Sequence, residues 1–306
     1  MADQQIDVVR DVLQPVPRLL SNWTYQDPNL HLPKESEKTQ DYESDTTSIA
    51  SQIAKGRIEN GRRYQALKDD VYWSPSDEQQ FEAFELGIFS TLELAKAVGL
   101  STVRGVDLFP PPVTWVPPNC LFEVDDIQKE WTWREPFDLI HIRQLLGSFT
   151  PEGWKGLYQQ CFENLAPGGW IEQIEFDVRV KSDDGSLPAN SVLAGWGNNF
   201  IGCGERAGRS LTTQETMRAS IEAAGFVDVH ERLYKVPMGP WAKDRLLKEV
   251  GLLNLQHWKS GLEGYAMWLL TKFGAPTPWT KEEVEIYLVN VRKELKDSRI
   301  HAYGYA

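Results

Sequence analysis

The stretch that decides the fold is VRGVDLFPPPVTWVPPNCLFEVDDI, residues Val103–Ile127. It holds two apolar runs that each end in acid: Asp107 follows the first run, and Asp125 with Asp126 follows the second. A proline-rich connection separates them, and proline cannot continue a central strand. Two successive strands tipped by carboxylates predict an α/β sheet that binds a nucleotide-like ligand beyond the carboxyl ends of its strands.

Outward from this stretch, predicted strands and helices alternate, which is the pattern of a mostly parallel sheet. Upstream, apolar residues at helical spacing predict a helix over Phe81–Val98, with Ser76 or Asp77 as its N-cap. Residues 299–306 predict the beginning of a final strand. The remaining expected elements are strands at Thr102–Leu108, Cys120–Val124, Phe137–Ile142, Trp170–Val180 and Phe226–Tyr234, and helices at Glu152–Leu165, Thr212–Ala224, Trp241–Phe273 and Lys281–Ser298, the last one capped by Thr280.

The composition narrows the class of protein. The 306 residues carry a net charge of -12, which argues against a nucleic-acid or anionic-membrane surface, because such surfaces need clustered Lys and Arg. No apolar run is long enough for a membrane span, so we expect a cytoplasmic protein, with the nucleus as the alternative. The three cysteines share no metal-ligand spacing and are expected to be buried core residues, with no metal bound.

The first part of the chain differs from the rest. Residues 1–52 include a polar, acidic and Ser/Thr-rich segment that cannot bury enough apolar surface to offset the entropy of ordering. We therefore expect a disordered tail at 1–52 and one domain over 53–306, in which the Trp-bearing region of about 190–280 forms a helical lid.

Several long strings carry a resemblance to a known family. ENGRRYQALKDDVYWSPSDEQQ (59–80), FDLIHIRQLLGS (137–148), LAPGGWIEQIEFD (165–177), SDDGSLP (182–188) and RIHAY (299–303) resemble the LaeA-like methyltransferases of filamentous fungi, from roughly Thr46 onward. These are class I S-adenosylmethionine (SAM)-dependent enzymes often found in secondary-metabolite gene clusters. The resemblance implies a Rossmann-like, doubly wound sheet and SAM as cofactor. The Trp-rich region suits a small hydrophobic metabolite as acceptor.

One family feature has no counterpart. The family carries a strand and a glycine-rich turn of the type LDLGTGTG before its first long helix, whereas no G-x-G occurs between Phe81 and Val106. FELGIF (84–89) and TLELAKA (91–97) resemble the helices on either side of that strand, and here they are fused. We therefore expect a sheet without its first, central strand. The strand at 102–108 then either pairs directly with that at 137–142 or leaves a gap between them.

The resemblance also implies cofactor-binding residues. Asp107 matches the acid that accepts hydrogen bonds from the ribose hydroxyls, and Asp125 and Asp126 stand where an acid contacts the adenine amino group, with Ile127 as the apolar neighbour. The missing glycines would have let the backbone approach the cofactor, and the N–H groups of the following helix would have bound its methionine carboxylate. The alternative is that acids at strand ends merely cap the next turn.

Catalytic and acceptor-binding candidates are fewer. His141 lies near the carboxyl end of a predicted strand and titrates near neutral pH, so it is the candidate general base; the alternative is a histidine satisfied by a backbone group. Arg143 could bind an acidic substrate or pair with a carboxylate. The tryptophans Trp196, Trp241 and Trp258 suit a planar acceptor, although aromatic residues at helical spacing more often belong to a core.

Three functions remain open on this sequence. The chain is a working methyltransferase, a non-catalytic pseudo-methyltransferase that binds a metabolite or a pathway enzyme, or a regulatory protein that acts through a partner.

Overall fold

The computed structural model describes residues 56–65, 73–80, 91–92, 94–96, 98–99, 101–109 and 116–306 of the chain. The expected tail at 1–52 and most of the expected helix at Phe81–Val98 lie outside the described residues. At the start of that helix, Asp77 accepts a hydrogen bond from the backbone N–H of Gln80 at 3.0 Å, so the predicted N-cap is present.

Two parallel strand pairs form the sheet part of the domain. β3 (Val103–Asp107) pairs with β4 (Cys120–Val124), and β5 (Phe137–Arg143) pairs with β6 (Leu165–Ile174). The expected α/β class with parallel strands is confirmed. Within the described residues, the two pairs are separate two-stranded sheets and β3 does not pair with β5. Of the two arrangements expected for the strand at 102–108, direct pairing is therefore not the one observed.

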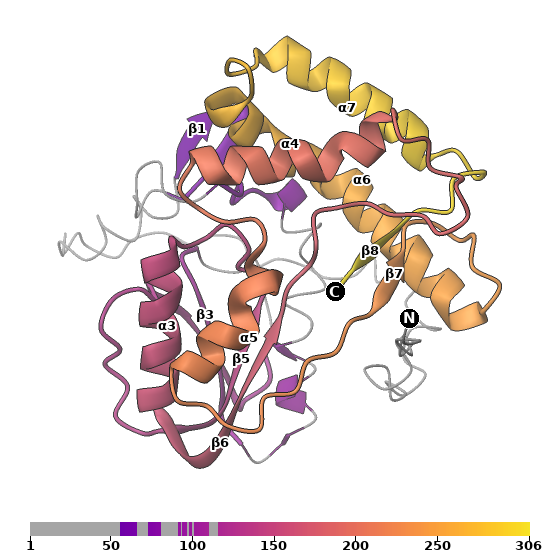
Figure 1. The fold of residues 1–306 in the computed structure, drawn as a ribbon. Helices are drawn as coiled ribbons and strands as arrows, with labels where there is room; N and C mark the ends of the chain where they lie inside the picture. The colour runs from indigo at the N-terminus through magenta and orange to yellow at the C-terminus, as the bar shows by residue number, and fades with distance from the viewer. Residues whose placement is uncertain are drawn as a thin grey trace, which may run out of the picture.

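Helices α3 (Pro151–Glu163) and α5 (Thr213–Ala223) pack beside the β5–β6 pair (Figure 1). α3 begins where the Thr150 hydroxyl accepts the backbone N–H of Gly153 at 3.1 Å. The side chains that bury this face are apolar or aromatic and come from β5, the loop after it, α3 and α5: Ile142, Phe149, Trp154, Leu157, Tyr158, Cys161 and Ile221.

A helical layer, made of α4 (Val192–Arg206), α6 (Arg245–Phe273) and α7 (Lys281–Leu295), lies at the end of the molecule toward which β6 runs (Figure 1). Thr280 and Glu283 form a capping box at the start of α7, which confirms the predicted cap. Leu146, from the loop after β5, is buried in the same cluster as the helices. The layer is therefore packed directly against the carboxyl end of the β5–β6 pair.

The end of the chain closes a short antiparallel pair, β7 (Lys235–Pro237) with β8 (Tyr303–Tyr305). The turn SDDGSLP, which carried part of the family resemblance, holds β8 in place. Asp184 contacts the His301 ring at 2.6 Å, and the Tyr303 hydroxyl donates to Asp183 at 2.7 Å. The segments SDDGSLP and RIHAY thus contact each other and hold the last strand in place.

Two strand predictions need correction. None of the residues 226–233 is in a strand, and the ladder begins only at β7, because β8 is short and Asp228 adopts a positive φ of 55°. The strand expected at Trp170–Val180 is instead Leu165–Ile174; its start lies in LAPGG, and the residues after Ile174 leave β5 to bond β8 through Asp177 and Lys181.

The hairpin of β1 (Arg57–Glu59) and β2 (Arg62–Tyr64) was not predicted. Asn60 and Gly61, both with positive φ, turn β1 into β2, and Asn-Gly is a strong hairpin signal. Helix α4 lies within the region of about 190–280 that was expected to be helical, but its bounds were not predicted. The three cysteines are free and buried, as predicted, and among the described residues we find no helix that could span a bilayer.

Candidate functional site

A small cavity of about 60 Å³ lies at the carboxyl ends of β3 and β4. The four residues predicted to bind a cofactor, Asp107, Asp125, Asp126 and Ile127, all line it. Leu145, Ser148 and Phe149 form another part of the wall, and they come from the loop that follows β5.

The Asp107 carboxylate is at the end of β3 and accepts the backbone N–H of Phe109 at 3.0 Å. Its side chain is open to solvent on one side, while the surrounding protein desolvates it and raises its pKa above the usual range. Asp107 therefore caps its own turn, as the alternative reading expected, and also faces the cavity.

The two acids after β4 are arranged differently from each other. Asp125 is exposed and accepts the backbone N–H of Asp126 at 2.7 Å, whereas Asp126 is buried and accepts that of Gln128 at 3.1 Å. The carbonyl of Ile127 accepts the Trp131 indole N–H at 2.9 Å. These bonds fix the segment without help from a ligand.

The loop after β5, residues 144–149, is held by a carboxylate that sequence reasoning missed. Glu175, two per cent exposed, accepts the backbone N–H groups of Leu145 and Leu146 at 3.2 and 3.1 Å. Desolvation raises the pKa of Glu175 to about 7. Gln173 donates to Glu175 at 3.1 Å and accepts from Tyr158 at 2.7 Å. The sequence signal that could have identified Glu175 is its position directly after the end of β6.

Three further contacts hold the same loop from outside. The Trp73 indole N–H donates to the carbonyl of Leu146 at 3.1 Å, and the Gly147 N–H donates to that of Ser210 at 3.2 Å. Arg209 donates to the carbonyl of Ser148, and burial lowers the pKa of this guanidinium. The backbone that forms one wall of the cavity is thus fixed on several sides.

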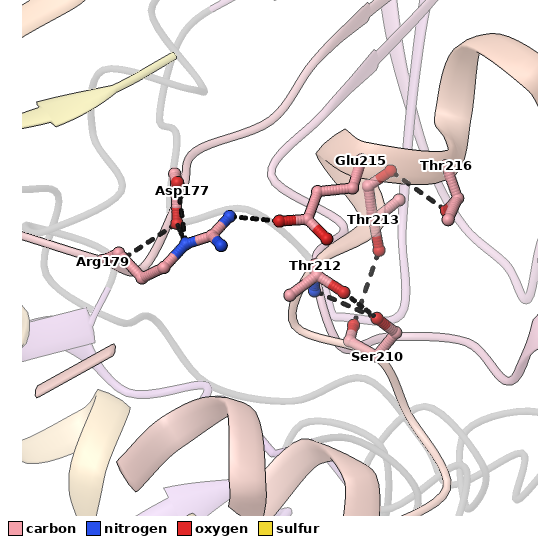
Figure 2. A network of polar contacts seen from close by, with 7 residues as sticks. All are labelled: Asp177, Arg179, Ser210, Thr212, Thr213, Glu215 and Thr216. Carbon is pink, nitrogen blue, oxygen red and sulfur yellow. Dashed lines mark hydrogen bonds and ion pairs between the residues drawn. The ribbon is translucent and has the colours of Figure 1, made fainter. Parts of the chain in front are cut away.

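Figure 2 shows how the segment after β6 is connected to the start of α5. Arg179 donates to Asp177 at 2.7 Å and to Glu215, in the first turn of α5, at 2.5 Å. The Ser210 and Thr212 hydroxyls, just before α5, are 2.9 Å apart. Because the carbonyl of Ser210 also accepts from Gly147, the start of α5 bridges this segment and the loop after β5.

His141, the predicted base, is not part of the cavity wall. It is exposed on β5, and its Nδ1 atom is 2.7 Å from the Glu172 carboxylate on β6. Ile142, the next residue, is buried against α3, so His141 faces the opposite side of the strand pair. Arg143 ends β5, where burial lowers its pKa. The structure brings neither residue together with the acids of β3 and β4.

The three predicted acceptor-binding tryptophans belong to the helical layer or its margin. Trp196 is three per cent exposed, stacked on Phe200 at 4.1 Å and tilted against Trp258 at 5.1 Å. Trp241 donates to the carbonyl of Ala302 at 2.8 Å and stacks on His301. Trp241 and Trp258 are half-buried.

Two parallel strand pairs with helices beside them define this chain as an α/β protein. The methyltransferase domain family matches residues 86–231. Methyltransferase pytC of Aspergillus terreus is 30% identical over 294 residues, covering 86% of this chain and 89% of that protein. The secondary metabolism regulator LAE1 of Cochliobolus heterostrophus is 30% identical over 286 residues, covering 81% and 91%.

A more distant relative is the protein-methionine methyltransferase laeA of Emericella nidulans, 26% identical over 290 residues, which cover 80% of this chain and 73% of that protein. Among solved structures, phospholethanolamine N-methyltransferase 2 of Haemonchus contortus matches with a TM-score of 0.37 and 13% identity over 70% of this chain and 44% of that one. The chain belongs to the class I SAM-dependent methyltransferase family, in the group that includes pytC and the LaeA-type regulators.

Proposed function

We propose that the chain is a methyltransferase-type protein of fungal secondary metabolism that takes SAM as cofactor and a small hydrophobic molecule as acceptor. The observation that supports this most is the cavity at the ends of β3 and β4, which gathers Asp107, Asp125, Asp126 and Ile127. Carboxylates there can accept hydrogen bonds from ribose hydroxyls and from an exocyclic amino group. An apolar wall suits the face of an adenine ring.

When bound, SAM supplies an activated methyl group, so the protein's part is to orient the acceptor and exclude water. The half-buried rings of Trp241 and Trp258 are the proposed contacts for a planar acceptor, with Arg143 for an acidic one. Trp196 has the weakest support as a contact, because its ring is already enclosed by other aromatic rings. His141 lies beside Glu172 and does not line the cavity, so it can act as the general base only if the acceptor binds at that separate place.

The second candidate is a pseudo-methyltransferase that binds a metabolite, a pathway enzyme or a regulatory partner. Two observations favour it. No G-x-G occurs between Phe81 and Val106. In addition, β3–β4 and β5–β6 are separate pairs in the described residues. A doubly wound sheet has its first strand at the centre, so its loss would leave two separate strand pairs of this kind. In that case, nothing from the glycine-rich turn holds the methionine end of SAM.

A label-transfer experiment separates the candidates. The purified chain is incubated with methyl-labelled SAM and a panel of planar phenolic metabolites, and the label is followed in the solvent-extractable and protein fractions. Solvent-extractable label that disappears in Asp107→Ala supports the small-molecule methyltransferase. Label in the protein fraction instead indicates a protein acceptor, and metabolite binding without transfer indicates the accessory role.

A further inference from the structure

Helix α7 has a second apolar stripe, on the face that points away from the rest of the protein. Its inner stripe is buried in the core of the helical layer and consists of Val284, Leu288, Val291 and Leu295. Ile286 and Val289 lie on the opposite face of the helix and are 65% and 61% exposed. Figure 1 shows α7 on the outer side of the layer. The outer face of a surface helix is normally polar, so two neighbouring apolar side chains there indicate a contact surface.

Opposite charges flank the two exposed apolar residues. Glu282 comes four residues before Ile286, and Lys293 comes four residues after Val289. Both charged residues are exposed. Spacings of four, three and four residues place all four side chains on one face of a helix. The outer stripe of α7, defined as Glu282, Ile286, Val289 and Lys293, therefore has the order acid, apolar, apolar, base.

This order makes the outer stripe complementary to itself in the antiparallel direction. Two copies of α7 can lie side by side in opposite directions, with Ile286 of one copy facing Val289 of the other. Both helices rise by the same distance per residue, so Glu282 of each copy then faces Lys293 of the other. Apolar side chains meet at the centre and opposite charges meet at both ends. A two-fold symmetric dimer requires a self-complementary surface of this kind.

The surface beside the outer stripe is concave and partly aromatic. An open hollow of about 310 Å³ is lined by Trp279, Glu283, Ile286 and Tyr287. The rings of Trp279 and Tyr287 are in edge contact, with their centroids 5.3 Å apart. One helix from each copy buries less area than the roughly 1,200–2,000 Å² of a standard stable interface. We therefore expect a weak dimer, with a Kd of about 10–100 µM.

We propose that the outer stripe of α7 is an interface through which two copies of this chain form an antiparallel, two-fold symmetric dimer. The partner that it fits is a second copy, because the order of charges along the stripe matches its own reverse. The proposal is independent of the proposed function, since no residue of the stripe lines the cavity at the ends of β3 and β4.

Sedimentation equilibrium of the full chain, at concentrations up to about 300 µM, measures the dimer. Val289→Asp introduces a carboxylate at the apolar centre of the interface, twice in a symmetric dimer, and should raise the Kd more than about thirtyfold. The matched control is Val227→Asp, at a residue that is 82% exposed and lies between α5 and β7. The control should leave the Kd within about twofold of that of the unaltered chain.

Exchange of the two charges tests the antiparallel register. Glu282→Lys and Lys293→Glu each set like charges against each other at both ends of the dimer, and each should raise the Kd about tenfold. The double variant restores opposite charges and should return the Kd to within about threefold of the original value. Each substitution also opposes the dipole of α7 at its end of the helix. Damage to the helix itself would therefore be largest in the double variant, so a structural effect does not explain recovery there.

The possible outcomes are distinct. A dimer that Val289→Asp weakens and that the double charge variant recovers supports the proposal. A dimer that Val289→Asp leaves intact overturns it, because the two copies then meet elsewhere. A chain that is monomeric at every concentration also overturns it and leaves the stripe to a partner of another kind. Failure of the double variant to recover overturns the antiparallel arrangement and the proposal with it. None of these results affects the label-transfer experiment, which tests the proposed function separately.

Discussion

Asp125 donates its backbone N–H to the carbonyl of Asp107 at 3.0 Å, one step beyond the last paired residues of β3 and β4. This bond continues the parallel ladder past the strands, so the two acidic strand ends leave the sheet side by side. Asp126, the next residue, is thereby brought to the same cavity as Asp107. The placement follows from strand register alone and does not depend on a bound ligand.

The first prediction concerns the pH dependence of stability. Burial raises the pKa of Glu175 from its ordinary 4.5 to about 7, so the folded protein holds this proton more tightly than the unfolded chain. The resulting stabilisation is complete below about pH 4.5 and is lost as the pH rises through about 7. Glu175→Gln should therefore reduce the fall in unfolding free energy between about pH 5 and 8, by at most about 3 kcal/mol.

Urea unfolding at the two pH values measures this difference. Glu163→Gln, an exposed substitution at the end of α3, is the control and should leave the fall unchanged. An identical fall in Glu175→Gln and the unaltered chain would show that Glu175 does not titrate in this range.

The second prediction concerns the loop after β5. Gly147 has a φ of 71°, and an added Cβ would be 2.6 Å from a Leu211 methyl and 3.0 Å from the Trp73 indole nitrogen. Gly185 has a similar φ of 75° but no atom within 4 Å. Both alanine variants incur the backbone cost of about 1–2 kcal/mol, and Gly147→Ala should lose about 1–3 kcal/mol more through crowding. Equal losses in denaturant unfolding would contradict the packing described for this loop.

The third prediction separates core from surface tryptophans. Trp196 is enclosed by aromatic rings, whereas Trp170 on β6 is 63% exposed. Trp196→Ala should lower the free energy of unfolding by about 3–5 kcal/mol, and Trp170→Ala should change it by no more than about 0.5 kcal/mol. Chemical denaturation followed by circular dichroism measures both. A small effect at Trp196 would favour a ligand-binding role over a core role.

Much of the fold followed from local pattern. β3, β4 and β5 were predicted within about one residue at each end, because each is a short apolar run bounded by turn residues or acids. The strand expected at Phe226–Tyr234 was wrong because a strand needs a partner, and β8 meets only the residues from Tyr234 onward. Partner availability is a property of the tertiary fold that local periodicity does not contain.

The candidate site was likewise predicted only in part from the sequence. The acids that line the cavity could be named from their position at strand ends and from the family resemblance. Glu175 could not, because its role depends on bonds between the loop after β5 and the end of β6. His141 was predicted as a general base from its place near the end of a strand. Side chains alternate along β5, so His141 lies on the face opposite Ile142, which is buried against α3.

We propose that the strand-end acids bind the adenosine part of SAM, and that its methionine end is weakly held because the sequence has no G-x-G between Phe81 and Val106. Calorimetric titration of one preparation with adenosine and with SAM tests it most directly. We predict that SAM binds no more than about threefold more tightly than adenosine, and that Asp107→Ala weakens both. A micromolar Kd for SAM, about a hundredfold tighter than that for adenosine, would contradict the claim, because another segment of the chain would then hold the methionine end.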